Sequence, residues 1–411
     1  MKTKPLNHYQ VNFFKRILTI SFLFLFQCSP AQEMSLLFLG DIMGHGPQIK
    51  SAWNDSLKKY NYNEVFKPVG DIISSVDFAV ANLEVTLAGP PFDGYPQFSS
   101  PDELAEACKN NGIDVLVTAN NHSCDRGSEG IQRTNQVLDS LGILHTGTFS
   151  NQKNRDSLNL LVLEKEGIRV GLLNYTYGTN GIPFHAPTYV NLLDSSLILK
   201  DLKFARTKHL DKLIVFVHWG AEYQDQPNQY QQIFNQFFKS HGVDIVIGSH
   251  PHVVQPMHYI KDKDEEFLTV YSLGNFVSNQ RDFRKDGGAM FRCSIVKKDK
   301  STIHDKEYIL TWVNKFYAHK KWHYEVLPCS HKMYSKEYFS KNEDYAKMLA
   351  YSNHAKNLFA DNNINIQEGF PYPKIHLQKH EPQELSHYKT KKWIKKLNLF
   401  KHRKKKKKDA K

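Results

Sequence analysis

The feature of this sequence that most constrains its fold is a set of short apolar runs that each end in polar side chains. The run VDIVI is followed at once by GSHPHVVQ, residues 248–255, which places His250 and His252 directly after a predicted strand. Four other runs end in the same way: SLLFLG at Asp41, DFAVANLE at Asn82 and Glu84, IDVLVTANNH at Asn120, Asn121 and His122, and KLIVFVHWG at His218. Apolar runs without clear alternation are typical of strands covered on both faces. We therefore expect these polar ends to meet at one edge of a sheet, where metals and phosphates bind in open α/β folds.

Helical patterns fall between these runs. The segment 101–112 starts with proline and acidic residues and ends at glycine, and the segments 128–141 and 229–242 carry apolar residues at near-helical spacing. Strand, polar end, helix and next strand follow one another along the chain, which favours a mainly parallel sheet layered with helices. The length of 411 residues suits one large α/β domain with additions, or two modest domains.

The first 31 residues have the pattern of an export signal. Four basic residues precede the apolar stretch 17–26, which is too short to span a bilayer comfortably, and small residues at 29–31 offer a cleavage site. Cys28 leaves a lipoprotein open as an alternative to soluble export or an uncleaved amino-terminal anchor. We expect an exported protein that is periplasmic, extracellular or membrane-anchored at the cell envelope.

The net charge of +12 is concentrated at the two ends of the chain. Residues 390–411 hold about twelve basic residues against one acidic residue, and about four basic residues precede Gln32, so the body between them is close to neutral. A nucleic-acid-binding body is disfavoured, and no nucleic-acid partner is expected. In the tail, Trp393, Ile394 and Leu397 lie among lysines, a pattern suited to an anionic membrane surface or another polyanion. A merely solvated tail is the alternative.

Past Phe291 the chain becomes more polar and aromatic. The stretch 309–328 alternates in part, which predicts added strands or a hairpin, and 335–362 has the pattern of a surface-exposed helix. We predict four regions: an export signal over 1–31, a main domain over 32–300, a carboxyl-terminal extension packed on that domain over 301–389, and a basic tail over 390–411.

Beyond Cys28, the chain has four cysteines and no CxxC pair. An exported protein can form disulfides, but four cysteines allow three pairings and the sequence favours none of them. Zinc held by thiolates is not expected. Cys124 lacks an obvious activating partner, so we expect a packed thiol there.

The polar side chains at the predicted strand ends offer oxygen and nitrogen ligands. One aspartate, one glutamate, a few asparagines and three histidines suit Zn, Mn or Fe, whereas a calcium site would need a denser carboxylate cage. A hydrolytic metal centre is the simplest interpretation. Taken alone, each residue also has a structural explanation, because Asp and Asn often satisfy backbone groups after a strand. Asp125 is expected to cap the helix that opens near Ser128.

Six sequence blocks occur in an order that matches a known family. They are GDIM at 40–43, NLE at 82–84, NNHSCDRGSEG at 120–130, HWGAEY at 218–223, GSHPHVVQ at 248–255 and YSLGNF at 271–276. Together they resemble the CapA family of bacterial capsule synthesis proteins associated with poly-γ-glutamate, within the calcineurin-like metallophosphoesterase superfamily. The resemblance covers residues 35–291. It implies a four-layer α/β/β/α metallophosphatase-like sandwich, with two facing sheets and a metal centre at one edge.

The resemblance also implies roles for individual residues. One or two divalent transition-metal ions (Mn, Zn or Fe) would be held by Asp41, Glu84, Asn121, His218, His250 and His252. His122 matches the histidine that protonates the leaving group or steadies the transition state. The candidate substrate-binding residues are Asn82, Asn120, Glu222 and Tyr223.

Two positions depart from the superfamily pattern. Met43 stands where the first motif normally has a histidine, and a thioether is a poor ligand for a hard metal. His45, two residues further on, is an alternative ligand. The NLE block replaces the usual Gly-Asp block, and Glu84 is longer than the aspartate it replaces.

Two functions from different classes follow from this pattern. The first is an exported phosphoesterase of capsule or poly-γ-glutamate biosynthesis, which acts through a metal-activated water on a phosphoester or polyanionic envelope substrate. The second is a non-catalytic capsule-assembly or polymer-binding factor on the same fold, acting within a capsule synthase complex. Met43 keeps the second function open, and nucleic-acid binding through the lysine tail is the least favoured.

Overall fold

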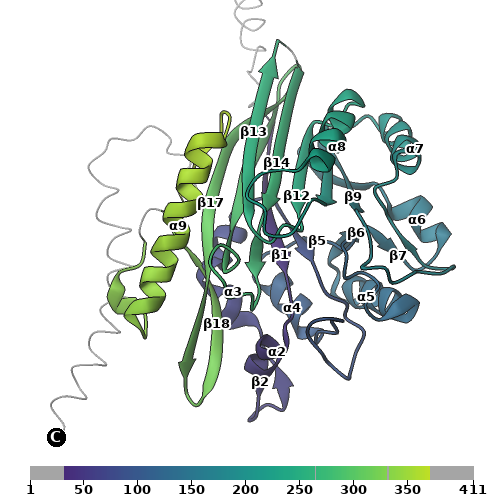
Figure 1. Ribbon diagram of the computed structural model, residues 1–411. Helices are drawn as coiled ribbons and strands as arrows, with labels where there is room; N and C mark the ends of the chain where they lie inside the picture. The colour runs from purple at the N-terminus through teal and green to yellow at the C-terminus, as the bar shows by residue number, and fades with distance from the viewer. Residues whose placement is uncertain (1–31, 264, 331–332, 371–411) are drawn as a thin grey trace, which may run out of the picture. The chain divides into compact units, whose positions relative to one another are not determined.

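The apolar runs form the central strands of two facing sheets in the computed structural model, which describes residues 32–263, 265–330 and 333–370 (Figure 1). In the first sheet the strand order is β18 (Lys321–Pro328), β17 (Ser301–Ala318), β16 (Gly287–Lys297), β1 (Gln32–Ile42), β4 (Phe78–Leu83), β5 (Val115–Val117) and β6 (Leu144–Thr146). Two short strands, β15 (Asn275–Val277) and β19 (Gln367–Glu368), pair with β1 and β17. The predicted export signal and basic tail lie outside the described residues.

The second sheet has the order β13 (Val254–Asp262), β14 (Glu265–Leu273), β12 (Ile245–Ser249), β11 (Lys212–His218), β9 (Ile168–Thr176) and β8 (Leu161–Lys165). Both sheets are parallel in one part, from β1 to β6 and from β9 to β14, and antiparallel where β16 to β18, β8 and β13 are added. Two small ladders join β2 (Trp53–Asn54) to β3 (Lys59–Tyr60) and β7 (Thr148–Phe149) to β10 (Tyr189–Val190).

Helices cover the outer face of each sheet. The first sheet packs against α2 (Gly46–Ala52), α3 (Asn63–Ile73), α4 (Glu103–Asn110) and α5 (Gly127–Leu141), and the second against α7 (Ser195–Arg206) and α8 (Gln229–Ser240). A third apolar cluster, which includes Phe38, Phe216 and Ile247, fills the space between the sheets. The four-layer α/β/β/α sandwich is therefore confirmed. A short helix, α6 (Gln152–Leu158), and the 3-10 turn η2 (Lys336–Tyr338) complete the smaller elements.

The predicted helices form where their end signals lie. The segments 101–112, 128–141 and 229–242 contain α4, α5 and α8. Gly142 ends α5 with φ +65°, a conformation that glycine adopts without steric cost. The Asn228 side chain accepts from the Gln231 N–H at 2.9 Å at the start of α8.

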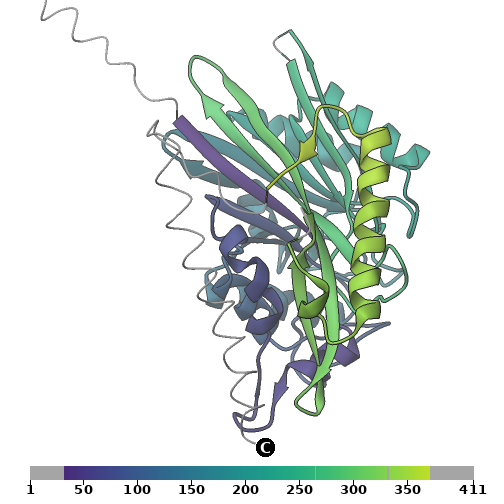
Figure 2. The same cartoon turned by 90° about the vertical axis from the view of Figure 1, so that its left-hand side faces the viewer.

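The carboxyl-terminal residues add to the first sheet and close one side of the sandwich. The predicted strands within 309–328 are present as the β17–β18 hairpin, which pairs with β16. The predicted helix is α9 (Asn342–Asn362), which lies along β13 and β17 (Figure 2). Its expected surface exposure is wrong for one face, because Met348, Tyr351 and Phe359 are buried in the core between the sheets.

The four cysteines of the described residues are unpaired and buried. Cys124 packs in a small apolar cluster with Ala119, Ile131 and Val190. Burial raises the pKa of its thiol to about 11, which keeps it protonated at neutral pH. The packed thiol predicted at this position is confirmed.

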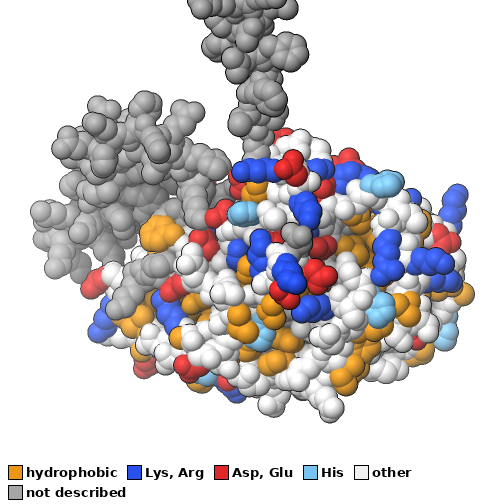
Figure 3. Space-filling model, turned by 90° about the horizontal axis from the view of Figure 1, so that it is seen from above, with side chains coloured by type: hydrophobic (Ala, Val, Ile, Leu, Met, Phe, Trp, Pro, Cys, Tyr) orange, Lys and Arg blue, Asp and Glu red, His pale blue; other side chains and the backbone are white. Residues whose placement is uncertain are grey.

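Charged side chains of both signs are interspersed at the end of the molecule where the β13–β14 hairpin turns (Figure 3). Several charged residues of these strands are paired. Lys212 lies 3.2 Å from Asp244 and 3.5 Å from Glu266, and Lys261 lies 3.2 Å from Glu266.

Within the part of the chain that the structure describes, no helix has the length and apolar character that a membrane span requires.

The backbones of β1 and of the segment that links β14 to β15 approach each other closely at Gly40 and Gly274. The chain passes from β14 to β15, and so from the second sheet to the first, at Gly274, whose φ is +67°. The Asp41 N–H donates to the Gly274 carbonyl at 3.0 Å. A Cβ added to Gly40 would lie 1.9 Å from that carbonyl oxygen. Only glycine at position 40 allows β1 to lie this near.

We expect Gly40→Ala to lower the free energy of unfolding by about 2 kcal/mol or more, because an overpacked backbone contact forces the strands apart. A urea titration followed by fluorescence measures the change. Gly46→Ala is the matched control, since an added Cβ there meets nothing within 4 Å. An equal loss of stability in both variants would contradict the close approach.

Candidate metal centre

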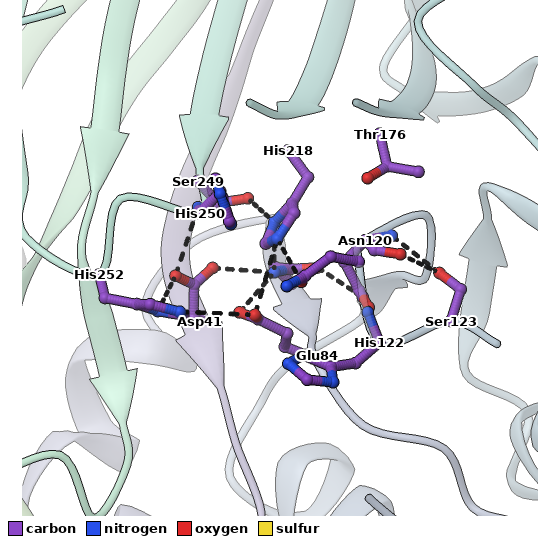
Figure 4. A network of polar contacts seen from close by, with 12 residues as sticks. Asp41, Glu84, Asn120, His122, Ser123, Thr176, His218, Ser249, His250 and His252 are labelled. Carbon is purple, nitrogen blue, oxygen red and sulfur yellow. Dashed lines mark hydrogen bonds and ion pairs between the residues drawn. The ribbon is translucent and has the colours of Figure 1, made fainter. Parts of the chain in front are cut away.

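The carboxyl ends of the parallel strands bring the predicted polar residues together at the edge where the two sheets meet (Figure 4). In the first sheet Asp41 pairs with Asn82 on β4 and with Asn275 on β15. In the second sheet His218 pairs with Ser249 on β12 and with Thr176 on β9. The register of each sheet therefore places its polar ends side by side.

Two buried carboxylates occupy the middle of this cluster. Asp41 and Glu84 are both fully buried. Asn82 donates to Asp41 Oδ1 at 2.8 Å and lies 3.5 Å from Glu84 Oε2. Burial, followed by the nearby charge of Asp41, raises the pKa of Glu84 well above its usual range. Among the described residues, neither carboxylate has an ion pair with a lysine or arginine.

Three histidines surround the carboxylates. His218 Nε2 and His252 Nε2 lie 3.6 Å and 3.7 Å from Glu84 Oε1, and His252 Nδ1 lies 3.2 Å from Asp41 Oδ2. The His250 ring centroid is 4.8 Å from that of His218 and 5.9 Å from that of His252. Burial lowers the pKa of His250 to about 3 and that of His218 well below its usual range. Both imidazoles are therefore neutral at pH 7, as a metal ligand must be.

These residues form two overlapping groups of ligand atoms. Glu84, His250 and His252 make one group, and Asp41, Glu84 and His218 make the other, with the atoms of each group within 4.8 Å of one another. Glu84 Oε1 and His250 Nδ1 are buried and have no hydrogen-bond partner. An unpaired buried carboxylate oxygen is costly, and a cation beside it removes that cost. The donor set thus fits one or two divalent transition-metal ions, with Glu84 in both groups.

The turn that carries two of the histidines is strained. His250 and His252 have φ of +98° and +58°, on either side of Pro251. Residues other than glycine seldom adopt such angles, and the energetic cost is often found at functional sites. The His250 N–H lies 3.4 Å from Asp41 Oδ2, so the same turn also presents its backbone to the carboxylate.

Asn120 and Asn121, which follow β5, contact the cluster through their side chains. Asn121 Oδ1 lies 2.9 Å from His218 Nε2, which places this predicted ligand at the second group. Asn120 donates to the Leu83 carbonyl at 2.8 Å and to Asn82 Oδ1 at 3.2 Å. Asn82 and Asn120 are buried and hydrogen-bonded within the protein. A direct contact of either asparagine with substrate stays a prediction.

His122 belongs to a separate pair beside the cluster. Its Nδ1 lies 2.8 Å from Asp125 Oδ2, and the Phe98 N–H donates to the same oxygen at 2.7 Å. The Phe98 ring packs edge-on against the imidazole, with centroids 4.6 Å apart. The prediction that Asp125 caps a helix is wrong, because its carboxylate is used by these two groups and α5 has no side-chain cap.

Met43 and His45 do not join either group of ligand atoms. Met43 is 2% exposed and packs in the apolar cluster between the first sheet and its helices. His45 Nδ1 lies 3.2 Å from Gln48 Oε1 and 3.3 Å from the Asn279 N–H. Burial lowers the pKa of His45 to about 4. These contacts involve Nδ1, and a ligand role for His45 stays a prediction.

Glu222 and Tyr223 lie at the rim of the centre, after β11. Glu222 is exposed. The Tyr223 ring centroid is 6.2 Å from that of His252, and the Lys285 ammonium lies 4.3 Å above the Tyr223 ring. Substrate binding by this pair stays a prediction.

Several residues that support the ligands were not among the predicted site residues. Ser249 Oγ lies 2.9 Å from His218 Nδ1, and Asn275 Oδ1 lies 3.1 Å from His252 Nδ1, so each orients a ring that faces Glu84. Tyr177, after β9, has its ring centroid 4.5 Å from that of His250. The sequence could have indicated Tyr177, because the apolar run VGLLNYTYG also ends in polar residues.

Solved structures of two nucleotidases are similar to the chain at a low level. Haemophilus influenzae NAD nucleotidase matches 91% of this chain and 68% of that chain, with 12% identity and a TM-score of 0.44. The 5'-nucleotidase from Candida albicans SC5314 matches 79% of this chain and 58% of that chain, with 12% identity and a TM-score of 0.39. At such low TM-scores neither likeness carries a conclusion about this chain.

Two capsule proteins are similar over a large part of the sequence. Capsule biosynthesis protein CapA of Bacillus anthracis is 27% identical over 260 residues, which are 61% of this chain and 61% of that protein. PGA biosynthesis protein CapA of Bacillus subtilis (strain 168) is 27% identical over 259 residues, 60% of this chain and 64% of that protein. The match thus spans about three fifths of each relative's length.

The family model for the bacterial capsule synthesis protein PGA_cap matches residues 35–280. This range holds the strand ends that meet at the candidate metal centre, and the match confirms the resemblance seen in the six sequence blocks. The chain therefore belongs to the PGA_cap family of bacterial capsule synthesis proteins.

Proposed function

We propose that this protein is an exported, metal-dependent phosphoesterase of capsule biosynthesis that acts on a phosphoester or polyanionic substrate of the cell envelope. The observation that supports it most is the meeting of Asp41, Glu84 and three histidines around the unpaired Glu84 oxygen. The name of the Bacillus subtilis relative favours poly-γ-glutamate as the capsule polymer. A capsule synthase complex is a proposed partner, and an anionic membrane surface is the proposed partner of the basic tail.

The residues that would hold one or two ions are Asp41, Glu84, Asn121, His218, His250 and His252. Such ions, when bound, lower the pKa of a water and neutralise charge on a phosphoryl oxygen. The protein supplies neutral imidazoles, because His218 and His250 are buried. Ser249 and Asn275 fix two of the rings, so the ligand atoms are arranged before any ion arrives.

His122 is the group that would give a proton to the leaving oxygen. Asp125 binds Nδ1, which leaves Nε2 as the nitrogen available to a substrate. The same contact with the carboxylate fixes the orientation of the ring that a general acid needs. Phe98 covers one side of the ring and so limits its movement.

A non-catalytic role in capsule assembly or polymer binding is the second candidate. One observation favours it: Met43, which stands where the superfamily has a histidine, is buried in the core and offers nothing to the centre. A site that has lost a ligand can keep its fold and its anion-binding surface without turnover.

The test is hydrolysis by the purified protein after loading with Mn²⁺, Zn²⁺, Fe²⁺ or Co²⁺, using p-nitrophenyl phosphate and bis-p-nitrophenyl phosphate. The phosphoesterase should bind metal and lose activity in EDTA, with recovery when the metal is restored. A protein that stays inert with every metal, yet binds polyglutamate, would support the assembly role instead.

A further inference from the structure

Tyr177 lies at the mouth of the metal centre and has no part in the roles described above. It follows β9, whose last residue, Thr176, is in register with His218. The Tyr177 N–H donates to the His218 carbonyl at 2.9 Å. The pairing of β9 with β11 therefore fixes the backbone of Tyr177 beside a candidate ligand.

The side chain of Tyr177 covers two of the histidines and still faces solvent. Its ring centroid lies 4.5 Å from that of His250 and 6.3 Å from that of His218. Its hydroxyl lies beside the side chain of Asn121, a candidate ligand. The residue is nevertheless 39% exposed. A large aromatic surface beside a buried polar centre is thus open to a ligand.

The loop after Tyr177 returns to the same asparagine. Asn121 donates to Asn180 Oδ1 at 3.2 Å, and the Ile182 N–H closes a turn onto the Thr179 carbonyl at 2.9 Å. Asn180 has φ +52° and Gly181 has φ +73°, which makes the turn tight. The backbone of Tyr177 is therefore fixed by β9 on one side and by this turn on the other, and a side chain on such a backbone loses little conformational freedom when a ligand packs on it.

The other tyrosine at the centre is less suited to this role. The Lys285 ammonium lies over the Tyr223 ring, and the Lys285 carbonyl accepts from Asn275 at 2.8 Å. The Tyr223 ring is therefore already covered by a cation in a cation–π contact. Tyr177 is the tyrosine with an open apolar surface next to His250.

We propose that Tyr177 is a platform for a ring in the substrate, so that the substrate is a phosphoester whose organic part carries a cyclic group next to the phosphoryl group. This inference rests on the proposed function, which places the phosphoryl group at the metal centre. The organic part then extends past His250 and packs on the exposed side of Tyr177. Planar rings and the apolar faces of cyclic groups gain affinity from such contact.

The test compares two phosphonates that cannot be hydrolysed, phenylphosphonate with a ring and methylphosphonate without one, by calorimetric titration of the Mn²⁺-loaded protein. The wild type should bind phenylphosphonate about tenfold more tightly than methylphosphonate. Tyr177→Leu should remove this preference, with both affinities measured on protein that holds as much Mn²⁺ as the wild type. Tyr177→Phe keeps the ring and should keep the preference.

Tyr317→Leu is the matched control, because Tyr317 is 56% exposed and packs on Trp322 in the β17–β18 hairpin. Equal affinity of the wild type for both phosphonates, or a preference that survives Tyr177→Leu, would overturn the platform and leave the phosphoesterase proposal standing if hydrolysis is observed. If neither phosphonate binds, both the platform and the proposed phosphoryl site are wrong.

Discussion

Replacing Glu84 with glutamine is expected to abolish metal binding and to reduce hydrolysis by about a hundredfold or more. Glu84 is the one carboxylate present in both groups of ligand atoms, so its loss removes a ligand from each. Glutamine keeps the shape of the side chain and removes its charge. Metal content measured by mass spectrometry of the purified protein, together with the rate of bis-p-nitrophenyl phosphate hydrolysis, provides the check.

Glu84→Gln is expected to raise the stability of the metal-free protein and to lower the stability of the metal-loaded protein. The pKa of Glu84 is raised in the folded protein, so the metal-free wild type loses stability as pH rises above the ordinary glutamate value and towards the raised one. Glu84→Gln removes this loss. At pH 8 in EDTA the variant should therefore unfold at a higher temperature than the wild type, whereas in saturating Mn²⁺ the wild type should be the more stable.

Glu325→Gln provides the control for this experiment. Burial also raises the pKa of Glu325, which lies in β18 and is bonded to Asn314 and Tyr338. The change should alter neither metal content nor activity. If Glu84→Gln retains metal at the wild-type level, Glu84 is not a ligand.

Replacing His122 with asparagine is expected to lower kcat by about a hundredfold to ten-thousandfold, the usual contribution of a general acid. The metal content should stay at the wild-type level, because His122 belongs to neither group of ligand atoms. The loss should be larger for an alkyl phosphate than for p-nitrophenyl phosphate, since p-nitrophenolate leaves without needing a proton. Steady-state kinetics with both substrates measures the difference.

Two further variants make this prediction specific. Asp125→Asn should lower kcat by less than His122→Asn does, because Asp125 acts through its 2.8 Å contact with His122. The loss should again be larger for the alkyl phosphate than for p-nitrophenyl phosphate. His304→Asn changes an exposed histidine on β17 and should have no effect. An equal loss for both substrates in His122→Asn would contradict a proton-donating role.

The strand ends could be located from sequence because the information is local. Asp41, His218 and His250 each follow an apolar run directly, and a buried parallel strand must present its last residues at the carboxyl edge of the sheet. The family blocks added the expectation of two facing sheets. That expectation matches the two facing sheets observed.

Features that depend on register between distant segments could not be read from the pattern. The pairing of Asp41 with Asn275 joins β1 to β15, and nothing in either segment alone specifies it. The position of Asp125 just before α5 fits a helix cap, but its spacing of three residues from His122 also fits a contact with that ring, and the sequence alone does not decide between them. The buried face of α9 was missed because lysine, asparagine and acidic residues are interspersed along the whole segment, although Met348, Tyr351 and Phe359 stand at helical spacing.

The measurement that tests the central claim most directly is anomalous scattering from crystals of the purified protein soaked in Mn²⁺ or Zn²⁺. We predict density for an ion bound by Glu84, His250 and His252, and for a second ion bound by Asp41, Glu84 and His218 if both groups fill. Anomalous peaks elsewhere on the protein, with none beside Glu84 at saturating metal, would contradict the assignment of this cluster as a metal centre.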